Sequence, residues 1–188
     1  DGDLDLVLAD WGPGNNMTND GGLTRLWLND GAGRFLDVAP LVGVTETHDG
    51  RAVALGDFWN RGALDVAVAA SGDRHALLRN QLGPRRSWLQ VELVGTRSNR
   101  EAVGARVTAR AGRLRQTREV VLGDGYGSQN ALRLHFGLAG ARRVDELVVR
   151  WPASGIVQRF RDVAAGRIYE IREGEDRLVE KRAPRPPA

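Results

Sequence analysis

The chain has 188 residues, of which 41% are hydrophobic and 6% aromatic, and its net charge is +3. This is enough apolar material for one or two small globular domains, and it excludes a disordered chain. The sequence contains no run of about 18 apolar residues, which is the length that a membrane-spanning helix needs. Without cysteine the chain has no disulfide, thiol nucleophile or thiolate metal site.

Two similar units occupy residues 1–81. In each, a Gly and an Asp three residues later lead into a short apolar run: DGDLDLVLA at the N-terminus and RGALDVAVA from Arg61. Asn29-Asp30-Gly31 between alternating apolar residues is a hairpin signal. Units of a few short strands are typical of β-propeller blades. Two blades do not close a ring, so we expect a piece of a longer propeller. The expected strands lie at residues 4–9, 23–28, 34–38, 51–55, 64–69 and 76–79.

The composition changes after the second unit. Residues 1–80 contain 12 acidic and 6 basic side chains, net −6, whereas residues 81–188 contain 12 acidic and 21 basic ones, net +9. The difference indicates two domains, with a boundary at Gly83–Arg86. Beyond it, polar and apolar residues alternate, as in Val103–Ala111, which is the pattern of a sheet with one wet face. Strands are expected at residues 88–94, 103–111, 114–122, 132–136, 144–151, 157–160 and 167–171.

The predicted fold class is therefore all-β: the last blades of a β-propeller, then an antiparallel β-sandwich-like domain. The expected divisions are residues 1–47 for a truncated blade, 48–82 for a degenerate second blade, 83–173 for the sandwich domain and 174–188 for a flexible tail. The tail is expected because charge rises from Glu173 onward and the chain ends in KRAPRPPA.

Several segments resemble known families. LWLNDGAGRFLDV (Leu26–Val38) and ALGDFWNRGALDVAVA (Ala54–Ala69) resemble the FG-GAP/VCBS repeat of integrin-like β-propellers. The second half resembles the ASPIC/UnbV domain of cartilage acidic protein and its bacterial relatives, with Ser-Asn-Arg, Gly-Ala-Arg-Val, Gly-Tyr-x-Ser-Gln, His-Phe-Gly-Leu and Arg-Trp-Pro in the expected order. The resemblance implies a secreted protein, extracellular or periplasmic, whose signal peptide would precede this sequence, and it implies no established catalytic activity.

The same resemblance implies calcium binding in the repeat loops. The family pattern D-x-D-x-D-G-x-x-D surrounds Ca²⁺ with oxygen ligands from positions one, three, five, seven and nine, as hard cations require. Asp1 would take position five, Asp3 position seven through its carbonyl, and Asp5 position nine. Positions one and three lie before this sequence. We therefore expect an incomplete Ca²⁺ loop at these three residues.

The second loop departs from the pattern. Asp57 and Asp65 keep positions one and nine, but Trp59 and Arg61 replace the carboxylates at positions three and five. We expect weak Ca²⁺ binding here or none. Our hypothesis is that the Arg61 guanidinium takes the place of the metal and pairs with both carboxylates. The alternative is that the two carboxylates only make turn hydrogen bonds to backbone N–H groups.

The Gly-rich segment GDGYGSQ is unlike a phosphate-binding loop, because it lacks the Lys-Ser/Thr ending and no helix follows. We expect a sharp loop between strands, with Tyr126, Ser128 and Gln129 as candidate contacts to a surface ligand. The three histidines lie in separate segments without a partner at metal-binding spacing, and His135 is expected to be structural. No nucleophile elbow supports a Ser-His-Asp set, so no catalytic or cofactor-binding residue is assigned.

Arginines concentrate on one expected hairpin: Arg106, Arg110, Arg113, Arg115 and Arg118. They could bind an acidic polysaccharide or a nucleic acid. The alternative is a solvated strand face that discourages edge aggregation. Three of them, Arg106, Arg110 and Arg115, are taken as candidate ligand contacts.

These observations predict a non-enzymatic extracellular binding or adhesion module, a calcium-supported propeller with an ASPIC/UnbV domain. Its partner would be a protein or a glycan, with nucleic acid disfavoured and no membrane span. The alternative is an enzyme or accessory protein of natural-product biosynthesis of the enediyne type, which a deep pocket with converging carboxylates or histidines would favour. A third interpretation, polyanion binding by the Arg-rich half, predicts heparin retention that falls steeply with salt.

Overall fold

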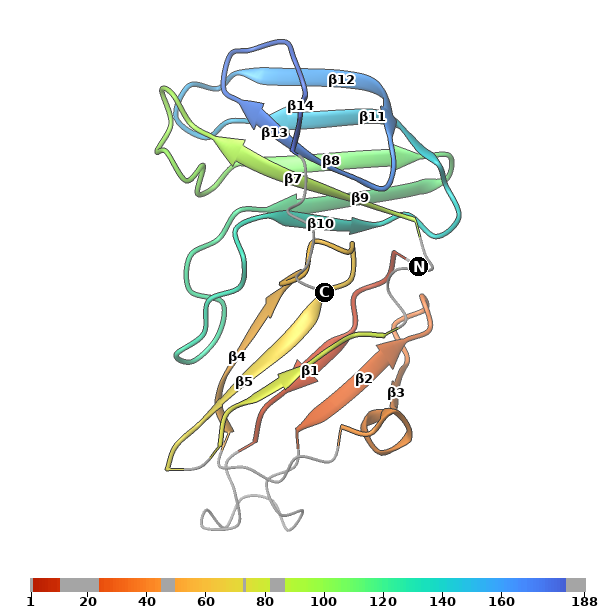
Figure 1. The fold of residues 1–188 in the computed structure, drawn as a ribbon. Helices are drawn as coiled ribbons and strands as arrows, with labels where there is room; N and C mark the ends of the chain where they lie inside the picture. Colours follow the sequence, from red (N-terminus) through yellow and green to blue (C-terminus); the bar gives the residue numbers. More distant parts are fainter. Residues whose placement is uncertain (1, 11–23, 45–49, 73, 82–86, 182–188) are drawn as a thin grey trace.

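The computed structural model describes residues 2–10, 24–44, 50–72, 74–81 and 87–181. Within them the regular structure is β apart from one 3-10 helix of four residues, Ala39–Val42, so the predicted all-β class is confirmed. No helix in these ranges is long and apolar enough to cross a bilayer. Figure 1 shows two parts, with β1 to β6 below and β7 to β14 above. Asp1, His48 and the whole of the expected domain boundary, Gly83–Arg86, lie outside the described residues.

The N-terminal part consists of two sheets of three antiparallel strands each. The first contains β1 (Leu6–Leu8), β2 (Arg25–Asn29) and β3 (Phe35–Asp37), and the second contains β4 (Gly50–Gly56), β5 (Asp65–Ala70) and β6 (Ala76–Leu78). The predicted hairpin turn joins β2 to β3, where Gly31 and Gly33 have φ of +80°. Neither sheet closes on itself, which fits a piece of a propeller.

An Asp–Asn contact recurs in both sheets. The backbone N–H of Asn29 donates to Asp5 at 2.9 Å, and the backbone N–H of Asn80 donates to Asp65 at 2.8 Å. The register of β1 with β2 and of β5 with β6 places the two Asn at the same point of the unit. The repeated Asp therefore ties the start of one strand to the end of the next.

The C-terminal part is a sandwich of two four-stranded sheets. One sheet has the order β10 (Leu134–Gly137), β7 (Trp88–Val94), β13 (Arg167–Arg172) and β14 (Val179–Lys181); the other has the order β12 (Val157–Ala164), β11 (Arg143–Arg150), β8 (Arg106–Ala111) and β9 (Leu114–Glu119). Strands from both sheets contribute to a single core cluster. Fully buried members of this cluster include Leu89, Val107, Phe136, Leu147 and Ile171.

Two details differ from the expectation. The central pair β7 and β13 runs parallel, whereas the other pairs in the sandwich are antiparallel as predicted. Strand β14 lies in the segment expected to be a flexible tail, yet it pairs with β13, and Lys181 forms ion pairs with Glu92 and Glu170 at 3.1 and 3.2 Å. The flexible-tail expectation is therefore wrong for Val179–Lys181, and residues 182–188 lie outside the described ranges.

Candidate functional site

The second repeat loop, between β4 and β5, is closed by hydrogen bonds among its own residues. Asp57 accepts the backbone N–H groups of Arg61 at 2.8 Å and of Gly62 at 2.6 Å, and the Gln90 side-chain amide at 2.7 Å. Arg61 Nη2 pairs with Asp65 at 3.1 Å. The hypothesis that the guanidinium pairs with a loop carboxylate is thus confirmed for Asp65 and wrong for Asp57, whose oxygens accept N–H donors as in the alternative.

This loop does not fit a calcium ion. A guanidinium lies against one of its two carboxylates, and N–H donors already occupy the other. In the first loop Asp5 accepts the N–H of Asn29, and Asp3 lies beside Gly31. Within the described ranges, no group of three or more His, Cys, Asp or Glu side chains is placed to hold a metal ion.

The Gly-rich loop between β9 and β10 runs along the free edge of β4 in the N-terminal part. The Ser128 hydroxyl accepts the N–H of Val53 at 3.0 Å, and the Asn130 side-chain oxygen accepts the N–H of Leu55 at 2.8 Å. The N–H of Ala131 donates to the Leu55 carbonyl at 2.9 Å. Because side chains and backbone of this loop bond to the strand edge, the loop serves as a substitute for a neighbouring strand.

Two of the three candidate contacts in this loop have structural roles. Besides its bond to β4, Ser128 donates to the Tyr126 carbonyl at 3.0 Å. Gln129 accepts the N–H of Gly123 at 2.7 Å and donates to the Asn130 carbonyl at 2.8 Å, which fixes the loop. Tyr126 is 77% exposed, Gln129 is also exposed, and Ser128 is half-buried.

A second junction forms where the tip of the β4–β5 loop meets the sandwich. Gly62, with φ of +78°, packs so closely against Trp88 that a Cβ would lie 2.0 Å from the indole. The Nε2 atom of His135 is 3.0 Å from the Gly62 carbonyl. Burial lowers the pKa of His135, although the bond to Gly62 acts in the opposite direction, so the ring is neutral near pH 7 and donates this hydrogen bond.

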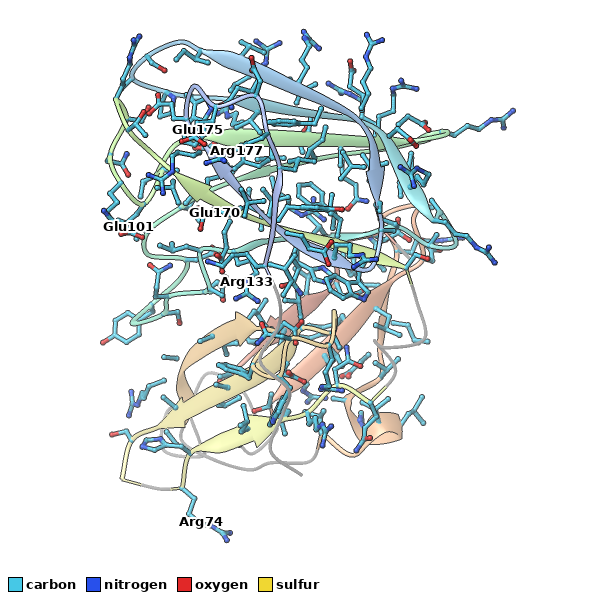
Figure 2. All side chains as sticks on the ribbon, turned by 45° about the horizontal axis from the view of Figure 1, so that its top comes forward. Arg74, Glu101, Arg133, Glu170, Glu175 and Arg177 are labelled. Atoms are coloured by element: carbon cyan, nitrogen blue, oxygen red, sulfur yellow. The ribbon has the colours of Figure 1, made fainter. Side chains whose placement is uncertain are left out.

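Arg133, which directly precedes β10 in the sandwich, also contributes to this junction. Its guanidinium donates to Asn60 in the N-terminal part at 2.5 Å and to Gln90 at 3.1 Å, and it pairs with Glu92 at 3.0 Å. Figure 2 shows Arg133 between the two parts. Polar contacts of this kind hold the parts in a defined orientation, because each group lost would leave a partner unpaired.

A groove of about 890 Å³ lies between β4 and the sandwich. Phe58 and Leu132 are among its lining residues, together with Glu92 and His135. Burial raises the pKa of Glu92, but the hydrogen bond from Lys181 and the charge of Arg133 outweigh it and keep the pKa below its usual value. Glu92, Arg133 and Lys181, which all line the groove, are therefore paired with one another.

Two family models match the chain in the predicted order. The FG-GAP-like repeat model matches residues 1–81, and the model described as ASPIC and UnbV matches residues 95–178. The chain thus combines a region of FG-GAP-like repeats with a following ASPIC and UnbV domain. No curated protein matches it. Both families indicate a β-rich module of the extracellular type.

The predicted arginine cluster is divided between the two faces of the ASPIC and UnbV sheet. Arg106, Arg110 and Arg115 are exposed on the outward face. Arg118 instead points inward, 5.8 Å above the ring of Phe136, and burial lowers its pKa. It is therefore not part of the surface cluster. The strand alternation of β9 predicts this difference, which counting arginines along the hairpin does not.

A buried carboxylate in the ASPIC and UnbV domain escaped the sequence analysis. Glu173, 3% exposed, accepts the backbone N–H groups of Thr96, Arg97 and Ser98 at 2.7 to 2.8 Å on one oxygen. Its other oxygen accepts the hydroxyls of Ser98 and Ser154 at 2.8 and 2.5 Å. Burial alone would raise its pKa, but these hydrogen bonds outweigh burial and lower the pKa from 4.5 to about 2. It anchors the turn after β7.

Proposed function

We propose that this chain is a non-enzymatic extracellular binding module, whose partner is a protein or a glycan. The FG-GAP-like sheets and the ASPIC and UnbV domain form the scaffold, and an exposed sheet face forms the contact surface. The observation that carries the proposal is the outward face of the β12-β11-β8-β9 sheet, where exposed arginines stand on four paired antiparallel strands. Rigid elements present a recognition surface at low entropic cost.

The contacts of the reactive side chains support a binding role over the biosynthetic alternative. His135 donates to a backbone carbonyl, Ser128 bonds to the edge of β4, and Asp57 accepts three N–H donors. A general base or nucleophile needs a free lone pair within reach of a substrate. The Ser128 and Asp57 oxygens accept N–H donors and the His135 Nε2–H group is bonded to Gly62, so all three side chains serve contacts between the two parts of the chain.

The proposal is tested by surface plasmon resonance with the whole chain immobilised. The probes are a panel of purified extracellular glycans and a panel of purified extracellular matrix proteins. Saturable binding to a member of either panel, with the bound molecule recovered unchanged, is the expected result. Chemical turnover of a bound probe, or no saturable binding in either panel, would refute the binding-module proposal.

Calcium support is proposed for the first repeat loop only. Asp3 and Asp5 supply oxygen atoms there, whereas Arg61 already neutralises the carboxylate of the second loop. An ion that binds only the folded state raises its melting temperature. Thermal melting with CaCl₂ should therefore show a higher midpoint than melting with EDTA, and Asp5→Asn should reduce the difference. Equal midpoints with CaCl₂ and EDTA would remove calcium from the function.

A further inference from the structure

The outward face of the β12-β11-β8-β9 sheet carries arginines from all four strands. Residues that lie opposite one another in the register form three cross-strand rows. The rows are Arg161, Glu146, Arg110 and Arg115; Arg159, Val148, Thr108 and Thr117; and Val157, Arg150, Arg106 and Glu119. The three rows thus hold six guanidinium groups and two carboxylates, and we call this surface the arginine face; a third carboxylate, Asp145, lies 3.6 Å from Arg110 at its border.

Like charges stand directly opposite each other on this face. Arg110 is the cross-strand partner of Arg115, and Arg106 is that of Arg150. Such pairs destabilise a sheet. Glu119 compensates Arg106 at 2.5 Å and Asp145 compensates Arg110 at 3.6 Å, but neither Arg115 nor Arg150 forms an ion pair within the described part of the chain. Each like-charge pair therefore keeps one guanidinium group without a carboxylate partner, and an uncompensated charge of this kind is typical of a functional surface.

Four of these arginines surround a hollow of about 150 Å³. They are Arg110, Arg115, Arg150 and Arg159, and the hollow is also lined by Thr108 and Val148. Glu146 lies at the same place, but its carboxylate is 3.5 Å from Arg159 and so is already offset. The hollow therefore offers a ligand the guanidinium groups of Arg115 and Arg150 and the Thr108 hydroxyl, beside Arg110, which it shares with Asp145 at 3.6 Å.

The spacing of the arginine face favours a densely charged linear ligand. Side chains two residues apart on a strand are separated by about 7 Å, and strands by about 5 Å, so the six arginines lie within roughly 14 Å in each direction. Guanidinium groups bind sulfate, phosphate and carboxylate oxygens through paired N–H donors. The three rows contain no aromatic residue, although stacking on aromatic rings is what single-stranded nucleic acids require.

We propose that the arginine face binds a sulfated polysaccharide, whose repeating unit carries several anionic groups. The proposal rests on the binding-module function above and names the ligand class of that same surface. The polymer lies across the strands, with one sulfate in the hollow between Arg110, Arg115 and Arg150. The acidic FG-GAP-like part, net −6 over residues 1–80, repels the polymer and confines it to this side of the molecule.

The test is the affinity of the whole chain for heparin, for chemically desulfated heparin and for duplex DNA, measured by calorimetry between 50 and 300 mM NaCl. We expect binding to heparin that weakens steeply with salt, and much weaker binding to the other two polymers. The variant Arg110→Gln/Arg115→Gln/Arg150→Gln should bind heparin about 10-fold more weakly or worse, with a salt slope smaller by about two to three.

A matched control separates the effect of the arginine face from the effect of lowering the total positive charge. Arg97→Gln/Arg100→Gln/Arg142→Gln removes the same charge from three exposed arginines outside the three rows and should change heparin affinity less than about twofold. Equal losses in the two triple variants would overturn the proposal.

A variant that binds heparin more tightly than the wild type provides a test that misfolding cannot imitate, because misfolding would weaken binding. Glu146→Gln removes a carboxylate from the hollow and releases Arg159, so heparin affinity should rise about two- to fivefold. Unchanged or weaker binding by this variant would contradict the assigned hollow. Desulfated heparin that binds as tightly as heparin would overturn the role of sulfate, and equally tight duplex DNA would replace the glycan with a nucleic acid. Binding to a matrix protein but not to heparin would refute this inference and leave the binding-module function standing.

Discussion

Replacing Glu173 with glutamine should remove one of the strongest single contributions to the stability of the ASPIC and UnbV domain. The substitution keeps the shape of the side chain and abolishes its charge. Three backbone N–H groups and two hydroxyls then face a neutral amide instead of a carboxylate. Hydrogen bonds to a charged group are roughly twice as strong as neutral ones, so the folded state loses more than the unfolded chain does.

The magnitude follows from the pKa. A carboxyl group with a pKa of 4.5 in the unfolded chain and about 2 in the folded one contributes up to about 3 kcal/mol near pH 7. For a chain of this size such a loss lowers the melting temperature by roughly 6–12 °C. Because the folded pKa is the lower one, the contribution is present in full above about pH 5 and disappears as the pH falls through 4.5 toward 2.

The assay is urea unfolding of wild type and Glu173→Gln, followed by tryptophan fluorescence, from pH 7 down to pH 3. The two proteins should differ most at neutral pH and converge as the solution becomes acidic. Glu175→Gln is the control, because Glu175 is only two residues away and makes side-chain ion pairs with Arg172 and Arg177 near the surface. A difference under about 0.5 kcal/mol at pH 7, or a constant difference down to pH 3, would refute the role of the carboxylate.

Further predictions concern the loop between β4 and β5. Gly62→Ala should destabilise the chain by about 3 kcal/mol or more in thermal melts, because its Cβ has no space, whereas Gly72→Ala, with nothing within 4 Å, should cost about 1 kcal/mol from its positive φ alone. Arg61→Met should lower the free energy of unfolding by about 3 kcal/mol, because it leaves the fully buried Asp65 without its cation. A loss below about 1 kcal/mol, the usual contribution of a surface ion pair, would contradict the pairing. The lowered pKa of His135 predicts that stability falls as the pH drops below 6.5, because the unfolded chain takes up the proton first; a His135→Gln variant with the same pH dependence would disprove it.

The strand pattern was readable from the sequence, because alternation is a local signal. Each strand expected in the described ranges is found within a few residues of its place. Strand β14 was missed because its residues, Val-Glu-Lys, are all exposed and show no apolar face. Its position is decided by the free edge of β13 and by the two carboxylates that face Lys181, which are features of the folded sheet.

The candidate site was only partly predictable for a similar reason. Arg106, Arg110 and Arg115 could be placed on one hairpin, but Arg150, Arg159 and Arg161 joined them through the pairing of β8 with β11 and of β11 with β12. The pairing of strands that are distant in sequence has no signal in the local residue pattern and could not be predicted from it. In the sequence Glu173 shows only as the last residue of the expected sandwich domain, where charge begins to rise, because its five donors come from segments far from it in the chain.

The bonds between β4 and the Gly-rich loop also bear on how the chain is made. The bonded residues are 75 positions apart, so the ribosome completes β4 long before it supplies the loop that covers its edge. At 5–20 residues per second, this edge waits for roughly 4–15 s. During that time it can pair with a strand of another nascent chain, which makes a holdase chaperone or slow delivery to the folding compartment most valuable at this stage.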